Sequence, residues 1–201
     1  MIMVMGTIMT VSLSPLTTFA YSFSGKKWNN PLVYYSVNNI FAQSFQIAIR
    51  KAEQTWNNGG SGFRFSYTGT TDRNPDVWDI NYRSDGYSDI GFSNRGDTGK
   101  IAGTRVSPDD SAIITEADVT LNIYYEFTTT GESEKYDLQD VLTHEFGHWL
   151  KLDDLYAQGP PSWCSLWVWE STMCYFIEPG ETRKRDIEGD DKSGIEAIYG
   201  T

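Results

Sequence analysis

The two histidines of this 201-residue chain, His144 and His148, stand four positions apart in the run HEFGH. They lie inside a longer segment, from an expected cap at Asp137 to Lys151, whose apolar residues recur at helical spacing. Residues i and i+4 share one face of a helix, so both imidazoles can bind one metal ion. The sequence therefore requires a helix that buries one face in the core and presents two metal ligands on another.

The residue after the first histidine is Glu145, which lies at the edge of the same helical face. From that position its carboxylate can accept a proton from an attacking water without ligating the metal. A chance match on a solvated helix is the alternative explanation of the run. That alternative is disfavoured because the motif uses both histidines of the chain and lies in a helix with a regular apolar stripe.

Two imidazoles are too few for a catalytic zinc site, which takes three protein ligands and keeps one open position. At about 100° per residue, a continued helix would place Asp154 roughly 240° and Asp153 about 140° round from His148. Either carboxylate reaches the metal only if the chain folds back after Lys151. Glu170, further downstream, is a rival third ligand, and we favour Asp154 over it.

The rest of the chain mixes helix and strand signals. Apolar residues at helical spacing predict a long helix over 39–57 and a short last helix ending at 200. Runs of β-branched and aromatic residues between turn residues predict several short strands. These strands are expected at 28–37, 63–67, 78–82, 88–92, 101–106 and 117–125. This mixture predicts an α+β fold with a twisted, mixed sheet.

The balance of charges excludes one large class of partners. Lys and Arg number 16 against 27 Asp and Glu, which gives a formal net charge of −11. So acidic a surface repels phosphate backbones, and we expect no nucleic-acid partner. Hydrophobic residues make up 39% of the chain, enough to bury a sizeable core.

Residues 1–20 have the features of a secretory signal peptide. They carry no charged side chain, their apolar stretch is too short to span a bilayer, and they end in small residues. We therefore expect cleavage after Ala20, a secreted and extracellular protein with one domain over 21–201, and no membrane span. A buried N-terminal strand is the alternative. Cys164 and Cys174 suit that compartment and predict a disulfide, with free thiols as the alternative.

Three motifs resemble those of a known group of enzymes. The run HEFGHWLKLDD, 144–154, resembles the extended zinc motif of the metzincin metalloproteases, HExxHxxGxxH or HExxHxxGxxD. The run STMCY, 171–175, resembles their Met-turn, and 190–200 is similar to the final helix of the matrixin branch. The resemblance covers essentially all of 21–201. It implies a metzincin-like catalytic domain with a twisted mixed five-stranded sheet, two long helices and a short C-terminal helix.

The resemblance also implies a role for each matching residue. One catalytic zinc would be bound by His144, His148 and Asp154, with Glu145 as the general base. Met173 would form an apolar floor beneath the metal. Tyr175 follows that methionine by two positions, as in branches where this tyrosine approaches the metal or the oxyanion; a packed aromatic is its alternative role.

The chain departs from the motif at Lys151, where the family has a glycine that permits a positive φ. The assignment of Asp154 therefore depends on Lys151 adopting a conformation that lysine rarely takes. A structural calcium is a further expectation, since acidic side chains in turns can bind this ion. The candidates for it are Asp97, Asp109, Asp110 and Asp118.

The resemblance places a protein or peptide substrate along an edge strand, for which 101–106 is the candidate. The tryptophan-rich segment 163–169 is expected to wall the pocket after the scissile bond. We therefore expect a monomeric, secreted zinc endopeptidase that hydrolyses peptide bonds. The alternative is a catalytically weak or inactive zinc-bound binding module with an exposed tryptophan surface.

Overall fold

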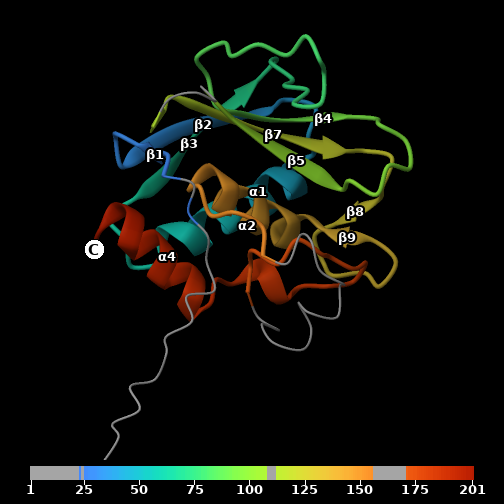
Figure 1. Cartoon of the computed structure of the whole chain (residues 1–201). Helices are drawn as coiled ribbons and strands as arrows, with labels where there is room; N and C mark the ends of the chain where they lie inside the picture. The colour runs from blue at the N-terminus through green and yellow to red at the C-terminus, as the bar shows by residue number, and fades with distance from the viewer. Residues whose placement is uncertain (1–22, 24, 108–111, 156–170) are drawn as a thin grey trace, which may run out of the picture.

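The computed structural model describes residues 23, 25–107, 112–155 and 171–201. Its helices are α1 (Gln43–Asn57), α2 (Leu138–Trp149), the 3-10 helix η1 (Arg183–Arg185) and α4 (Gly189–Tyr199). Figure 1 shows a β-sheet with α1 and α2 side by side beneath one of its faces, and α4 at the lower left. None of the described helices is long and apolar enough to cross a bilayer.

The sheet that covers α1 and α2 has five strands. The strands of the chain are β1 (Lys27–Trp28), β2 (Leu32–Asn38), β3 (Arg64–Thr71), β4 (Asp89–Ser93), β5 (Ala102–Ser107), β6 (Ile113–Ile114), β7 (Glu116–Asn122), β8 (Phe127–Thr128) and β9 (Tyr136–Asp137). The five-stranded sheet has the order β3-β2-β4-β7-β5, and only β5, at one edge, runs antiparallel to its neighbour. The predicted α+β fold with a mixed five-stranded sheet is confirmed.

Aromatic side chains fill the space between the sheet and α2. The rings of Tyr35 in β2 and Phe65 in β3 lie 5.4 and 4.8 Å from the ring of Phe146. Trp149 is fully buried against the same rings, so it belongs to the core rather than to a cleft, as predicted. Trp56 of α1 donates from its indole nitrogen to a backbone carbonyl of α2 at 2.7 Å. These contacts fix the face of α2 that turns away from the core.

Helix α2 begins where the sequence predicts. The side chain of Asp137 accepts a hydrogen bond from the backbone of Asp140 at 3.1 Å, which caps the helix. Arg185 donates to the same aspartate at 2.8 Å and compensates its buried charge. The helix ends at Trp149, two residues before the predicted end at Lys151, because the chain turns back there.

The prediction of a strand at 78–82 is wrong, because these residues form turns between β3 and β4. The side chain of Asp76 accepts from the backbone of Trp78 at 3.3 Å, and that of Asp79 accepts from Asn81 at 2.8 Å. Such side-chain bonds to the local backbone compete with the ladder of a sheet. The β-branched and aromatic residues of the segment therefore do not make it a strand.

Two glycines, paired in one row across the sheet on either side of a threonine, make room for this segment. Gly91 pairs with Thr120, which pairs on its other side with Gly103. A Cβ on Gly91 would lie 2.7 Å from Pro75, and one on Gly103 would lie 2.8 Å from the indole of Trp78. The segment therefore lies directly on the sheet, and its tryptophan covers the edge strand β5.

The other predicted elements are confirmed with shifted ends, except that bends at 29–31 divide the strand predicted at 28–37 into β1 and β2. Helix α1 begins at 43 rather than 39, since the side chain of Asn38 accepts from the backbone of Ile40 at 3.0 Å and holds a turn there. Strand β3 extends to 71 rather than 67. The expected signal at 1–20 and the segment 163–169 lie outside the described residues and stay predictions.

Candidate metal centre

The chain reverses direction immediately after α2. The backbone of Leu152 donates to the carbonyl of Gly147 at 3.1 Å, and that of Lys151 donates to His148 at 2.9 Å. This pair of bonds is the Schellman motif, which requires a left-handed residue at its turn, usually glycine. Lys151 takes that place with φ +66°, and it is the only non-glycine residue with positive φ in the described part of the chain.

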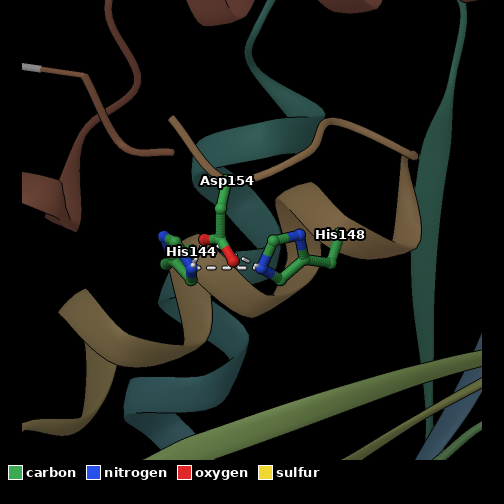
Figure 2. A group of neighbouring side chains, drawn as sticks. All are labelled: His144, His148 and Asp154. Atoms are coloured by element: carbon green, nitrogen blue, oxygen red, sulfur yellow. Dashed lines mark hydrogen bonds and ion pairs between the residues drawn. The ribbon is translucent and has the colours of Figure 1, made fainter. Parts of the chain in front are cut away.

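The reversal brings the side chain of Asp154 over the two histidines, as Figure 2 shows. The Nε2 atoms of His144 and His148 lie 3.1 Å apart, and Asp154 Oδ1 lies 3.1 and 3.5 Å from them. Ligand atoms at 2.0–2.1 Å from a tetrahedral zinc are about 3.3 Å apart. These three side chains form the one group of three metal-ligating residues found within the described ranges. The donor set and its spacing fit a zinc ion.

Backbone carbonyls fix the orientation of both imidazole rings. The Nδ1 atom of His144 lies 2.8 Å from the carbonyl of Thr172, and that of His148 lies 2.9 Å from the carbonyl of Leu152. A carbonyl oxygen can only accept, so each Nδ1 carries a proton, and in the neutral imidazole each Nε2 keeps its lone pair. The lone pairs are thereby held toward one point. Histidine ligands of metal sites are oriented in the same way, through a hydrogen bond donated by the other ring nitrogen.

The electrostatics of the three groups favour a cation between them. Burial raises the pKa of Asp154, but hydrogen bonds from His144 and His148 outweigh burial and hold this pKa well below its usual range. Burial lowers the pKa of His148, yet Asp154 and Glu145 raise it to about 9. The carboxylate thus stays ionised, and positive charge beside it is stabilised.

Glu145 lies beside this group and is 6% exposed. Its side chain accepts a hydrogen bond from the hydroxyl of Thr104, with Oγ1 2.6 Å from Oε2. Thr104 belongs to the edge strand β5, whose register pairs it with Val119 of β7. The carboxylate is therefore placed between the metal-ligating residues and the strand that flanks the cleft.

A cleft of about 1000 Å³ runs past these residues. Its lining includes residues of strand β5 together with His144, His148 and Asp154. The segment from Tyr175 to Ile177 also lines it. Tyr175 therefore lies in the cleft with the candidate ligands, and its role at the oxyanion stays a prediction.

The residues of the expected Met-turn lie against α2. Met173 is 1% exposed, and a Cβ added to Gly147 would lie 2.2 Å from its sulfur. The methionine thus packs on the helix turn between the two histidines, where the predicted floor would be. The backbone of Thr172 donates to Asp191 of α4 at 3.2 Å, which ties this turn to the last helix.

Three residues that contribute to the cleft carried no recognisable signal in the sequence. Thr104 and Trp78 line the cleft because of the register of β5 and the path of the segment before β4. Lys184 is 4% exposed, and its ammonium donates to the carbonyls of Cys174 and Phe176 at 2.9 and 2.6 Å. It fixes the backbone of the wall at Phe176.

The structure gives no support to the expected calcium site. Asp97 accepts a hydrogen bond from Tyr125 at 2.8 Å, whereas Asp118 is buried and accepts from Tyr82. Burial raises the pKa of Asp118 to about 8, which disfavours the ionised form that binds calcium. The other expected positions lie at 108–111, outside the described residues, as do Glu170 and Cys164. The predicted disulfide to Cys174 accordingly remains a prediction.

The fold and this group of side chains point first to a class, the zinc metallopeptidases. The comparison with family models then identifies the branch, because the model described as Matrixin matches residues 27–200. The chain belongs to the matrixin family, which agrees with the resemblance drawn from its motifs. Zinc is accordingly the metal expected at His144, His148 and Asp154.

Solved structures with similar folds include two at low sequence identity. One is high choriolytic enzyme 1, a hatching enzyme zinc-protease from Oryzias latipes (medaka), at 13% identity and a TM-score of 0.47, covering 87% of this chain and 92% of that one. The other is the structure of myroilysin, also at 13% identity and a TM-score of 0.47, covering 87% of this chain and 82% of that one. A search of curated proteins finds no match.

Proposed function

We propose that the protein is a zinc-dependent endopeptidase in which His144, His148 and Asp154 bind the metal and Glu145 acts as the general base. One observation carries the proposal: three ligand atoms from two segments meet at 3.1–3.5 Å, with both imidazoles held by backbone carbonyls. Two imidazoles and a carboxylate that converge in a cleft are the kind of cluster that marks a functional site. The substrate is a protein or peptide, as expected for the family.

Bound zinc would supply an acidified water and would polarise the scissile carbonyl. The chain's own residues supply the rest. Glu145 accepts the proton of the attacking water and passes it to the leaving amine. Its burial beside Thr104 keeps it next to the metal ligands rather than in bulk solvent. Tyr175, in the wall of the same cleft, is proposed to stabilise the oxyanion.

The substrate is proposed to lie along β5. This strand is at the edge of the sheet and pairs with β7 alone among the described strands. An extended peptide can add to such an edge through main-chain hydrogen bonds. A peptide there passes Glu145, which is in hydrogen-bond contact with the strand.

The test is digestion of casein or gelatin by the wild type and by Glu145→Ala, each with its zinc content measured. Activity in the wild type that is lost in the variant, with one zinc retained in both, supports the proposal. Equal inactivity of two zinc-loaded proteins would instead favour a zinc-bound binding module. The tryptophan surface of that alternative falls on 163–169, outside the described residues.

The third ligand is tested by a matched pair of variants. Asp154→Ala is expected to weaken zinc binding more than about 100-fold, since it removes a direct ligand. Glu170→Ala is expected to bind zinc like the wild type. The reverse result would transfer the assignment to Glu170.

We also propose that the protein is exported with a signal cleaved after Ala20 and that it carries a Cys164–Cys174 disulfide. The uncharged, apolar segment at 1–20 and the paired cysteines support this proposal. Intact-mass measurement of the secreted protein, with and without a reductant, tests both points. A secreted product that begins at Met1, or two alkylated thiols without reduction, would contradict them.

A further inference from the structure

We propose that Thr104 is a positioning residue that anchors the carboxylate of Glu145. The kinetic part of this proposal rests on the proposed function, in which Glu145 is the general base. The observation behind it is the short hydrogen bond from the threonine hydroxyl to Oε2, at 2.6 Å. Such a distance is typical of an O–H donor bound to a carboxylate, which is stronger than a bond between neutral groups.

The sheet geometry determines which way Thr104 points. Successive side chains of a strand alternate between the two faces of the sheet. Gly103 faces the outer segment, where Trp78 covers it, so Thr104 faces α2. There the hydroxyl lies against Glu145 both at the side chain and, at 3.5 Å, at the backbone carbonyl. The contact is therefore a consequence of the register of β5 over α2.

The bond gives the two carboxylate oxygens of Glu145 different roles. The hydroxyl of Thr104 has one proton, which it donates in a hydrogen bond to Oε2 of Glu145. No other hydrogen bond to this carboxylate is found among the described residues, so Oε1 is left for the attacking water. A free glutamate side chain samples many rotamers, and anchoring one oxygen removes most of that freedom before the substrate arrives.

The anchor also links the general base to substrate binding. Thr104 lies in β5, the edge strand along which the substrate is proposed to add. A peptide that pairs with this strand restricts its motion, and the carboxylate is attached to the same strand. The arrangement thus aligns the base with the scissile bond through one rigid element.

The kinetic test compares Thr104→Val with Thr104→Ser. Valine keeps the β-branched shape but has no hydroxyl, so kcat is expected to fall about 10- to 100-fold while KM stays within about 2-fold. Serine keeps the donor and is expected to restore kcat to within about 3-fold of the wild type. Thr70→Val, at an exposed position of the opposite edge strand β3, is the matched control and is expected to change neither constant.

Besides unchanged kinetics in Thr104→Val, two kinetic results would overturn the proposal. One is a rise in KM with unchanged kcat for Thr104→Val, which would make Thr104 a substrate contact. The other is an equal loss in the valine and serine variants. A zinc-loaded wild type that cleaves no peptide would overturn the proposed function itself, and a wild type that cleaves as well as Thr104→Val would overturn only the role of Thr104.

A second measurement needs neither zinc nor activity. In the metal-free protein, Thr104→Val is expected to lower the midpoint of thermal unfolding by about 3–8 °C, because a buried carboxylate loses its donor. In the background of Glu145→Ala, the same substitution is expected to lower the midpoint by less than about 1 °C. Equal decreases in the two backgrounds would show that the two side chains do not interact, and would refute the anchor.

Discussion

Replacement of Lys151 by glycine is expected to stabilise the protein. This residue has φ +66°, a left-handed conformation in which the Cβ of an L-residue crowds the backbone. The two Schellman bonds, from Leu152 to Gly147 and from Lys151 to His148, hold it there. A glycine at the same place forms the same bonds without that crowding.

The magnitude follows from two opposing contributions. Relief of the left-handed conformation is worth about 1–2 kcal/mol. Glycine also has more freedom in the unfolded chain, which offsets about 0.5–1 kcal/mol of that gain. The net stabilisation is then about 0.5–1 kcal/mol, and for a chain of this size that raises the midpoint of thermal unfolding by about 1–4 °C.

The assay is thermal unfolding of the wild type, Lys151→Gly and Lys151→Ala, each with zinc and after removal of zinc. Alanine removes the positive charge but keeps a Cβ, so it separates charge from backbone strain. Only the glycine variant should gain stability. A glycine variant that is less stable than the wild type, or no more stable than alanine, would refute the strain argument.

Three other substitutions test packing and charge. Gly147→Ala places a Cβ 2.2 Å from the sulfur of Met173; we expect a loss of about 1–3 kcal/mol in unfolding free energy, and unchanged chemical denaturation would contradict the packing. Gly103→Ala meets the indole of Trp78 at 2.8 Å and should lower the unfolding midpoint, a loss that Trp78→Ala in the same chain should largely reverse; additive losses would argue against that contact. Burial raises the pKa of Asp140 to about 7, so between about pH 4 and 7 the folded state binds more protons than the unfolded state and stability falls as pH rises. Asp140→Asn should remove this dependence, so midpoints of wild type and variant that run parallel across this range would refute it.

The metal-binding helix could be predicted from the sequence because its signals are local. The spacing of His144 and His148 places both on one helical face, and Asp137 caps the first turn of the same helix. Asp154 was harder to assign, since its position depends on a left-handed turn at a lysine. Helical periodicity alone would have carried the chain past that turn and placed the carboxylate away from the metal.

Contacts between distant segments could not be predicted in the same way. Thr104 and Glu145 are 41 positions apart, and their bond depends on how β5 lies over α2. The failed strand at 78–82 has a local cause, because Asp76 and Asp79 bind the backbone that a ladder would need. Residue types alone did not reveal this competition between side chain and sheet.

The two imidazoles are oriented by main-chain oxygens, at Leu152 and Thr172, rather than by side chains. Amino-acid exchange at either position leaves the acceptor in place, so the contacts to the imidazoles do not themselves restrict the type of these two buried residues. A deletion or insertion nearby shifts the oxygen itself and turns the ring away from the ion. In orthologues, the number of residues in the chain reversal after α2 and in the methionine turn should accordingly vary less than the residue types there.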